Sequence, residues 1–251
     1  MDSDRLHLDE VFLSLQGEGM EVGRPQLFLR LGGCPLRCSY CDTPRSWTAR
    51  PQYEVHLPSG TVQRDNPVDG QGLHDLLKDV LQVHGLVPAD VMLSVTGGEP
   101  LQQAAFLEAW LPQWTGPILL ETAGVHAEAL RSVLSSVALL SMDWKLPSTL
   151  REGEDLLQAA SCLAVAREQG TATQVKLVVT EETTDEEVAT ALTAIAAESP
   201  DCVVFLQPVT PFGKGPAAPD AARLLAWSLA HRSLPLDLRV LPQIHPLLGV
   251  R

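Results

Sequence analysis

GGCPLRCSYC (residues 32–41) is the stretch that decides the fold of this chain. It directly follows a strand-like apolar run at residues 26–31 and holds three cysteines with the spacing Cys-x3-Cys-x2-Cys. Three thiolates on a loop containing Gly and Pro can bind three irons of a [4Fe-4S] cluster, and the fourth iron then accepts an exogenous chelate. Cys34, Cys38 and Cys41 are therefore predicted to hold an iron–sulfur cluster.

A zinc site completed by a distant ligand is the alternative interpretation of this loop, because the chain has seven histidines. Zinc sites usually pair their cysteines in two Cys-x2-Cys knuckles, and the sequence has no second knuckle. The total of five cysteines is odd and fits metal ligation in a reducing compartment better than a disulfide framework. Cys162 and Cys202 lie in apolar stretches and are expected in the core. The cluster is favoured over zinc.

The bulk composition narrows the class of protein further. The 251 residues carry a formal net charge of −13, which disfavours nucleic acid as a partner. No apolar run approaches the roughly 20 residues of a membrane helix. The first residues are acidic and lack the basic-then-apolar order of a secretory signal. We expect a cytoplasmic enzyme with no membrane contact.

Short apolar strands alternate with helical stretches through most of the chain, which predicts an α/β fold with a parallel sheet. A strand at residues 7–15 precedes this pattern as an N-terminal extension. Residues 44–70 interrupt it as an insertion, with a hairpin expected at 53–62. One domain is predicted over residues 1–251. The expected later strands are 90–96, 117–122, 137–145, 174–180, 202–208 and 236–241, and the expected helices are 72–84, 101–110, 127–134, 154–168, 185–198 and 219–231.

Thr96-Gly97-Gly98-Glu99-Pro100 ends one predicted strand and precedes a helix. A plain strand-to-helix turn explains one glycine, with Glu99 as a favourable acid in the first helical turn. Two glycines followed by Glu-Pro instead suggest a backbone that approaches a ligand closely.

Other polar side chains stand at the carboxyl ends of predicted strands, where parallel sheets bind ligands. Ser141, Asp143 and Lys145 share one face of their strand by its period of two. Asp143 and Lys145 could form only a weak surface pair. The strand ends at residues 121–122 and 207–210 are polar too, however, which favours a pocket. Lys176 lies inside an apolar strand and could extend outward, and it is assigned no role.

The cysteine motif with Tyr40 before its last cysteine resembles the signature of the radical S-adenosylmethionine superfamily, and residues 97–99 resemble its GGE motif. This resemblance implies a partial (β/α)6 barrel. It also implies that S-adenosylmethionine chelates the open iron and is cleaved to a 5′-deoxyadenosyl radical. The radical abstracts a substrate hydrogen, so no protein side chain is expected to be the primary catalyst.

A narrower resemblance rests on motifs that extend over nearly the whole chain. With SLQGEG, Arg30, CPLRCSYCDT, TGGEP, ETAG, FLQPVT and PQIHPLLG, the chain resembles the 7-carboxy-7-deazaguanine synthase family. That family converts 6-carboxy-5,6,7,8-tetrahydropterin to 7-carboxy-7-deazaguanine with loss of ammonia, in 7-deazaguanine and queuosine biosynthesis. The resemblance also implies magnesium, a reducing partner such as flavodoxin or ferredoxin, and a homodimer.

The same resemblance assigns site residues by motif. Thr43 would contact magnesium, a hard cation that prefers oxygen ligands. Arg30 would face the substrate carboxylate, which suits a bidentate guanidinium. The other substrate-binding residues would be Leu15, Gln16, Gly17, Thr96 and His245, and S-adenosylmethionine would lie along Tyr40, Gly98, Glu99, Ser141, Met142, Asp143, Gln207, Pro208, Val209 and Thr210.

Three features depart from the expected pattern. Ala123 stands in ETAG where ETNG is expected and offers no side-chain amide, and Pro246 restrains the backbone after His245. The route of the insertion at 44–70 is not evident. A glycyl-radical-enzyme activase is the alternative within the superfamily, although QGEG and Arg30 suit a small anionic heterocycle better than a protein loop.

Overall fold

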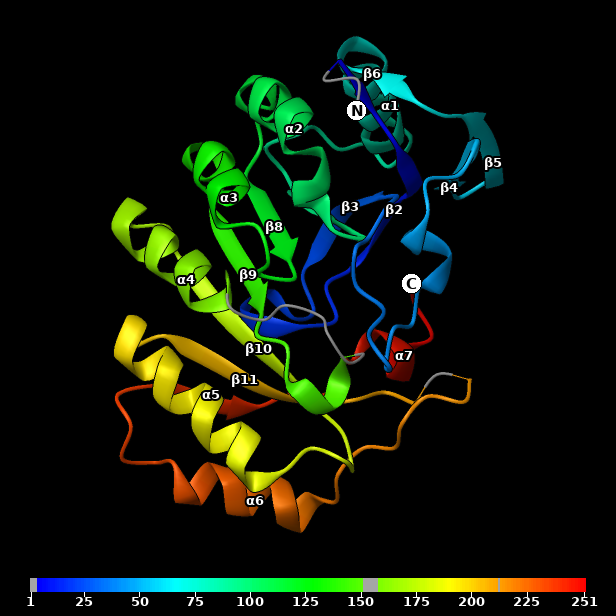
Figure 1. Cartoon of the computed structure of the whole chain (residues 1–251). Coiled ribbons are helices and arrows are strands. Elements are labelled where there is room, and N and C mark those ends of the chain that lie inside the picture. Colours follow the sequence, from blue (N-terminus) through cyan, green and yellow to red (C-terminus); the bar gives the residue numbers. More distant parts are fainter. Residues whose placement is uncertain (1–3, 151–157, 212) are drawn as a thin grey trace.

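A computed structural model describes residues 4–150, 158–211 and 213–251. Its centre is a sheet of ten strands in the order β12-β11-β10-β9-β8-β7-β3-β2-β4-β5 (Figure 1). The pairings from β3 to β12 are all parallel, which confirms the predicted α/β class. The parallel strands are β3 (Pro25–Leu31), β7 (Met92–Gly97), β8 (Ile118–Thr122), β9 (Leu139–Asp143), β10 (Thr173–Val179), β11 (Val203–Pro208) and β12 (Asp237–Val240).

Helices follow the parallel strands and lie along the outer side of the sheet (Figure 1). Their apolar faces pack on strands that are buried on both sides, which explains the continuous apolar runs of those strands. The predicted helix at 154–168 begins outside the described residues. The helices are α1 (Gly70–Val83), α2 (Ala104–Trp110), α3 (Ala127–Val133), α4 (Gln158–Gln169), α5 (Asp185–Glu198) and α6 (Ala221–Ala230).

Local sequence signals set several of these helix ends. The Asp69 carboxylate accepts a hydrogen bond from the Gly72 amide and begins α1. Thr184 and Glu187 form a reciprocal capping box at the start of α5. Each cap satisfies backbone donors that have no partner within the helix. Short 3₁₀ turns complete the connections: η1 (Gly19–Glu21), η2 (Pro44–Trp47), η3 (Pro100–Gln103), η4 (Leu111–Gln113), η5 (Leu134–Ser136) and η6 (Pro147–Thr149).

The N-terminal extension and the insertion both join the main sheet. Strand β2 (Leu8–Leu15) pairs antiparallel with β3. The expected hairpin is β4 (Gln52–Leu57) and β5 (Gly60–Asp65), and β4 pairs in parallel with β2. The insertion therefore extends the sheet beyond β2 and is not a separate excursion. Two short strands, β1 (Arg5–Leu6) and β6 (Val68–Asp69), form a small sheet of their own.

The order of the main sheet is open, with β12 and β5 at its edges, as a partial barrel requires. The last helix, α7 (His245–Leu248), lies near the carboxyl ends of the parallel strands (Figure 1). Within the described residues, every helix is too short or too polar to cross a bilayer.

Candidate functional site

A cavity of about 200 Å³ opens at the carboxyl ends of the parallel strands. Its walls come from the cysteine loop, from the ends of β7 to β11, from the turn after β2 and from the segment containing α7. The structure thus brings together most of the residues predicted for the site. Those lining the cavity are Leu15, Gln16, Gly17, Arg30, Cys34, Cys38, Tyr40, Cys41, Thr96, Gly98, Asp143, Gln207, Val209, Thr210 and His245.

Five predicted residues lie elsewhere. Thr43 lines a second, adjoining cavity with Asp42. Glu99, Ser141, Met142 and Pro208 do not line the main cavity. Their predicted ligand contacts are not tested by this placement.

The side chains of Glu99, Ser141 and Met142 are engaged with the protein. The Glu99 carboxylate is fully buried and accepts hydrogen bonds from the amides of Leu101 and Ala123. Ser141 accepts a hydrogen bond from Gln174, and Met142 packs in the core. Ala123, which lacks the expected amide side chain, thus contributes its backbone N–H.

The cysteine loop presents three free, half-buried thiols. Burial raises the pKa of Cys34 to about 11 and also raises the pKa of Cys41, so both thiols must lose a proton when they bind metal. All three cysteines line the main cavity, so a metal group held by them would face the space left for a ligand.

The two glycines of TGGEP hold the cysteine loop against β7. A Cβ on Gly97, whose φ is +140°, would lie 2.3 Å from the Leu31 nitrogen. A Cβ on Gly98 would lie 2.1 Å from the carbonyl oxygen of Gly33. The backbone that packs against these glycines is the protein's own, from β3 and the cysteine loop, and the close approach to a ligand stays a prediction. Gly98 also lines the cavity.

Lys176 points into the cavity and does not extend outward. Its side chain is 6% exposed, and it pairs with Glu18, with Asp143 Oδ1 at 3.4 Å and with Glu121 Oε2 at 3.7 Å. Burial lowers the pKa of this ammonium, but the three carboxylates outweigh burial and raise the pKa well above its ordinary value. Lys176 is therefore a buried cation among three acids.

A second lysine joins this group to the cysteine loop. Lys145 Nζ lies 2.6 Å from Asp143 Oδ2 and donates a 2.7 Å hydrogen bond to the Tyr40 hydroxyl. Asp143 and Lys145 thus form a buried pair in the cavity wall and not the weak surface pair considered from the sequence. Lys176, Lys145, Glu18, Glu121 and Asp143 are called the Lys176 cluster below.

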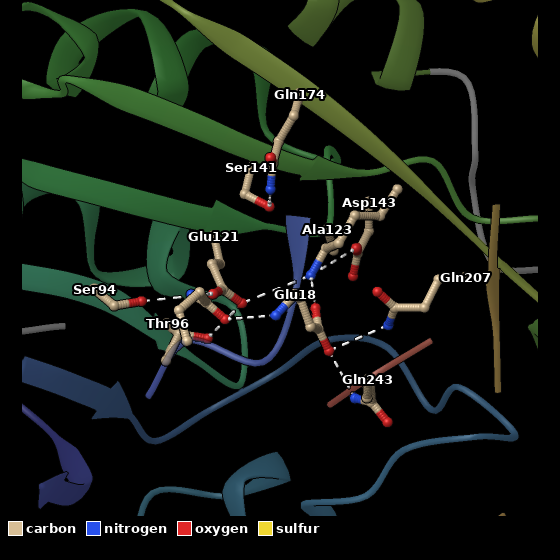
Figure 2. A network of polar contacts seen from close by, with 12 residues as sticks. Glu18, Ser94, Thr96, Glu121, Ala123, Ser141, Asp143, Gln174, Gln207 and Gln243 are labelled. Atoms are coloured by element: carbon tan, nitrogen blue, oxygen red, sulfur yellow. Dashed lines mark hydrogen bonds and ion pairs between the residues drawn. The ribbon is translucent and has the colours of Figure 1, made fainter. Parts of the chain in front are cut away.

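Glu18 is the point at which distant segments meet. Gln207 and Gln243 donate hydrogen bonds of 3.1 and 2.6 Å to its Oε1, as Figure 2 shows. Burial raises the pKa of Glu18, but the Lys176 ammonium outweighs it and holds the pKa below its ordinary value. The charged form of Glu18 thus joins the turn after β2 to β10, β11 and the segment before α7.

Glycines allow this turn to pack closely. A Cβ on Gly17 would lie 2.1 Å from the His245 ring, and the Gly17 carbonyl accepts a hydrogen bond from the Ile244 amide. Gln16 donates to Glu121 over 3.1 Å, and Thr96 donates to the same carboxylate over 3.3 Å (Figure 2).

A group of opposite composition lies on the other side of the cavity, around Glu10. Arg30, predicted to face a substrate carboxylate, lines the cavity and donates through Nε to Glu10 Oε1 over 2.8 Å. The second oxygen of Glu10 lies 2.6 Å from Arg45 and 2.7 Å from Arg251. Burial raises the pKa of Glu10, but these arginines outweigh it and lower the pKa. Glu10, Arg30, Arg45, His56 and Arg251 are called the Glu10 cluster below.

Sequence patterns did not predict Lys176, Gln243 or, apart from Arg30, the Glu10 cluster as parts of the site. One available signal could have found Lys176. In the parallel register, Lys176 stands beside Asp143 and Gln174 beside Ser141, so the four side chains share one face. Gln243 stands in the PQIHPLLG motif, two residues before the predicted His245, so that motif could have found it. Arg251 had no comparable signal, because it reaches the site through a contact 241 residues apart in the sequence.

Comparisons with known proteins agree with this arrangement. The 7-carboxy-7-deazaguanine synthase of Geobacter sulfurreducens is 36% identical over 253 residues, covering 99% of both chains. The chain belongs to the 7-carboxy-7-deazaguanine synthase family. The membership confirms the resemblance inferred from the motifs. A family model described as a 4Fe-4S single cluster domain matches residues 15–123, which contain all three cysteines of the loop.

Solved structures confirm the fold expected of this family. The crystal structure of QueE from Escherichia coli aligns with a TM-score of 0.57 at 21% identity and covers 94% of each chain. A radical SAM methyltransferase from Sphaerobacter thermophilus also aligns with a TM-score of 0.57, at 14% identity, covering 92% of this chain and 77% of its own. The predicted barrel type is therefore correct.

Proposed function

We propose that this chain converts 6-carboxy-5,6,7,8-tetrahydropterin to 7-carboxy-7-deazaguanine with loss of ammonia, as a single radical S-adenosylmethionine domain over residues 1–251. The observation that carries the proposal is the main cavity. In it the cysteine loop faces the QGEG turn and Arg30 across the ends of the parallel strands. The first set of residues suits a cluster and the second suits a small polar heterocycle with a carboxylate.

Cys34, Cys38 and Cys41 would hold the cluster, and Tyr40 and Gly98 would bind S-adenosylmethionine together with the ends of β9 and β11. When bound, the cluster and S-adenosylmethionine supply the adenosyl radical that abstracts a hydrogen from the substrate. The protein's own task is to place the two ligands and exclude water. The buried network around Lys176 supports this task, because it joins the strand ends near one ligand to the turn near the other.

The oxygen donors beside the cysteine loop support a magnesium site. Thr43 donates a 2.8 Å hydrogen bond to Asp42, and both residues line the second cavity. Magnesium prefers a few protein oxygens together with water and substrate oxygens. We therefore place it at Thr43, with the substrate carboxylate as a further ligand.

Three further features of the proposal come from the family. The enzyme would act in the cytoplasm as a homodimer, and a flavodoxin or ferredoxin would supply the electron. The formal net charge of −13 favours only a partner with a basic docking surface. We therefore assign the partner by family and not by charge.

The test is an anaerobic assay of the reconstituted protein with 6-carboxytetrahydropterin, S-adenosylmethionine, Mg²⁺ and dithionite, followed by mass analysis of the product. We expect 7-carboxy-7-deazaguanine, a brown protein with about four irons, and loss of both in Cys38→Ala. Iron and S-adenosylmethionine binding without this product would contradict the substrate assignment. A colourless protein with one zinc would contradict the cluster as well.

A further inference from the structure

The Glu10 cluster contains more guanidinium groups than its carboxylate can satisfy. Arg30, Arg45 and Arg251 all lie within 2.8 Å of Glu10, and His56 Nε2 lies 3.1 Å from it. Each guanidinium carries five N–H donors, whereas a carboxylate offers about four acceptor positions. Some of these donors are therefore available to another anion.

The three arginines differ in how many donors they have left. Arg45 is fully engaged, because its three nitrogens face Asp9, Glu10 and Glu54 separately. Among the described residues, Arg30 contacts a carboxylate only through Nε, and Arg251 only through Nη1. The spare donors thus belong to Arg30 and Arg251.

Both of these arginines also reach the two cavities. Arg30 and Arg251 line the main cavity and the second cavity, whereas Arg45 lines only the second. Arg30 lies over the Phe12 ring, 5.9 Å from its centroid, and Phe12 stacks on Phe28. The paired guanidiniums therefore stand next to an aromatic surface in the wall of the main cavity.

We propose that Arg251 is a specificity-determining residue that binds the carboxylate of the pterin substrate together with Arg30. The inference rests on the proposed function and adds to it a residue that no motif assigns. Glu10 holds the two guanidiniums in place, and the substrate carboxylate takes the donors that Glu10 leaves free. Two charge-assisted donors would distinguish a 6-carboxylated pterin from one without the carboxylate.

Calorimetry on the anaerobic holoprotein with S-adenosylmethionine tests this, with 6-carboxypterin and unsubstituted pterin as unreactive probes. We expect Arg251→Gln to lower the affinity for 6-carboxypterin by about 10- to 100-fold and to leave the affinity for pterin unchanged within about twofold. Arg251→Lys keeps the charge but not the planar fork and should recover part of the loss. Arg131→Gln, which removes an exposed arginine paired with Glu168, is the matched control and should change neither affinity.

Arg251 also anchors its segment, because its carbonyl oxygen accepts a hydrogen bond from Ser14. Ser14→Ala removes that anchor without changing charge and should leave the preference for 6-carboxypterin intact. Equal losses for both probes in Arg251→Gln, no loss at all, or the same selective loss in Ser14→Ala would overturn the role of the guanidinium. If the unaltered protein binds neither probe, the proposed function falls together with this inference.

Discussion

The Lys176 cluster lines the main cavity, and the Glu10 cluster, which has the opposite composition, reaches that cavity through Arg30 and Arg251. In the Lys176 cluster, three carboxylates surround two lysines, whereas in the Glu10 cluster three arginines converge on one carboxylate. Every charge of the first cluster faces a partner inside the protein. The second retains donors for a ligand. The Lys176 cluster thus holds segments of the protein together, and the Glu10 cluster offers donors that can select a ligand.

The two clusters also stand on different parts of the fold. The Lys176 cluster is built mainly on the carboxyl ends of β8, β9 and β10, which are strands of the parallel sheet. The Glu10 cluster is built on β2, β3, the insertion and the last residues of the described chain. Apart from Arg30 on β3, its members therefore come from segments added to the parallel sheet.

Lys176→Met should have the largest effect, because it removes a buried cation from among three half-buried carboxylates and leaves only Lys145 beside them. Breaking a buried ion pair from one side costs about 3–5 kcal/mol. The free energy of unfolding, measured anaerobically by urea titration at about pH 7.5, should fall by that amount. Arg45→Met, in the other cluster, should cost less, about 1–3 kcal/mol, because Arg30 and Arg251 still neutralise Glu10 and Arg50 still lies 3.7 Å from the buried Asp9. An equal or larger loss in Arg45→Met would break the comparison.

The pH dependence of Lys176→Met has a definite sign. In the unaltered protein the pKa values of Glu18 and Asp143 are lowered. Their charged forms therefore stabilise the fold at pH values above the ordinary carboxylate pKa, and this stabilisation is lost as the pH falls through the lowered pKa values. Without the lysine, their folded pKa values rise and protonation relieves the repulsion. The stability difference between the variant and the unaltered protein should therefore shrink from about pH 7.5 to about pH 5.5. A difference that is constant over this range would contradict the account.

The same contrast explains what the sequence could predict. The parallel strands follow from alternating patterns, and this prediction was confirmed. A cavity opens at the carboxyl ends of these strands, where the general rule for parallel sheets places ligands. Lys176 was assigned no role because β10 is apolar on both sides of it, and residue type alone cannot distinguish the cavity from solvent. The Glu10 cluster could not be predicted, because its contacts join segments up to 241 residues apart and no local pattern reports them.

Glycine substitutions compare the backbone of the parallel sheet, at Gly97, with the backbone of the turn after β2, at Gly17. Gly97→Ala should cost about 2–4 kcal/mol, because its positive φ strains any side chain and the obstacle is the backbone of Leu31. Gly17→Ala should cost less, about 1–2 kcal/mol, since its φ is not strained and the obstacle is the His245 side chain, whose ring can rotate while its Cβ, 3.0 Å away, shifts slightly. Urea titration measures both values. The KM for the pterin should rise in Gly17→Ala, and an unchanged KM would show that His245 and its segment do not shape the substrate site.

The smallest expected effect concerns Gln243, which joins the segment before α7 to the Lys176 cluster through Glu18. Gln243→Ala removes one of the groups that hold this segment, but Gln207 and Lys176 still satisfy Glu18. Global stability should therefore change by less than about 0.5 kcal/mol. The loss should appear as local opening, because the Ile244 amide donates to the Gly17 carbonyl beside the missing contact.

Hydrogen exchange followed by mass spectrometry measures that opening directly. A peptide covering residues 241–251 should exchange about fivefold faster in Gln243→Ala, which corresponds to about 1 kcal/mol of local stability. Peptides from β9 and β10 should exchange as in the unaltered protein, because their strands hold the rest of the Lys176 cluster. Faster exchange in all three peptides would mean that the added segment and the parallel strands open as one unit, so the organising and selecting parts of the cavity would not be separable.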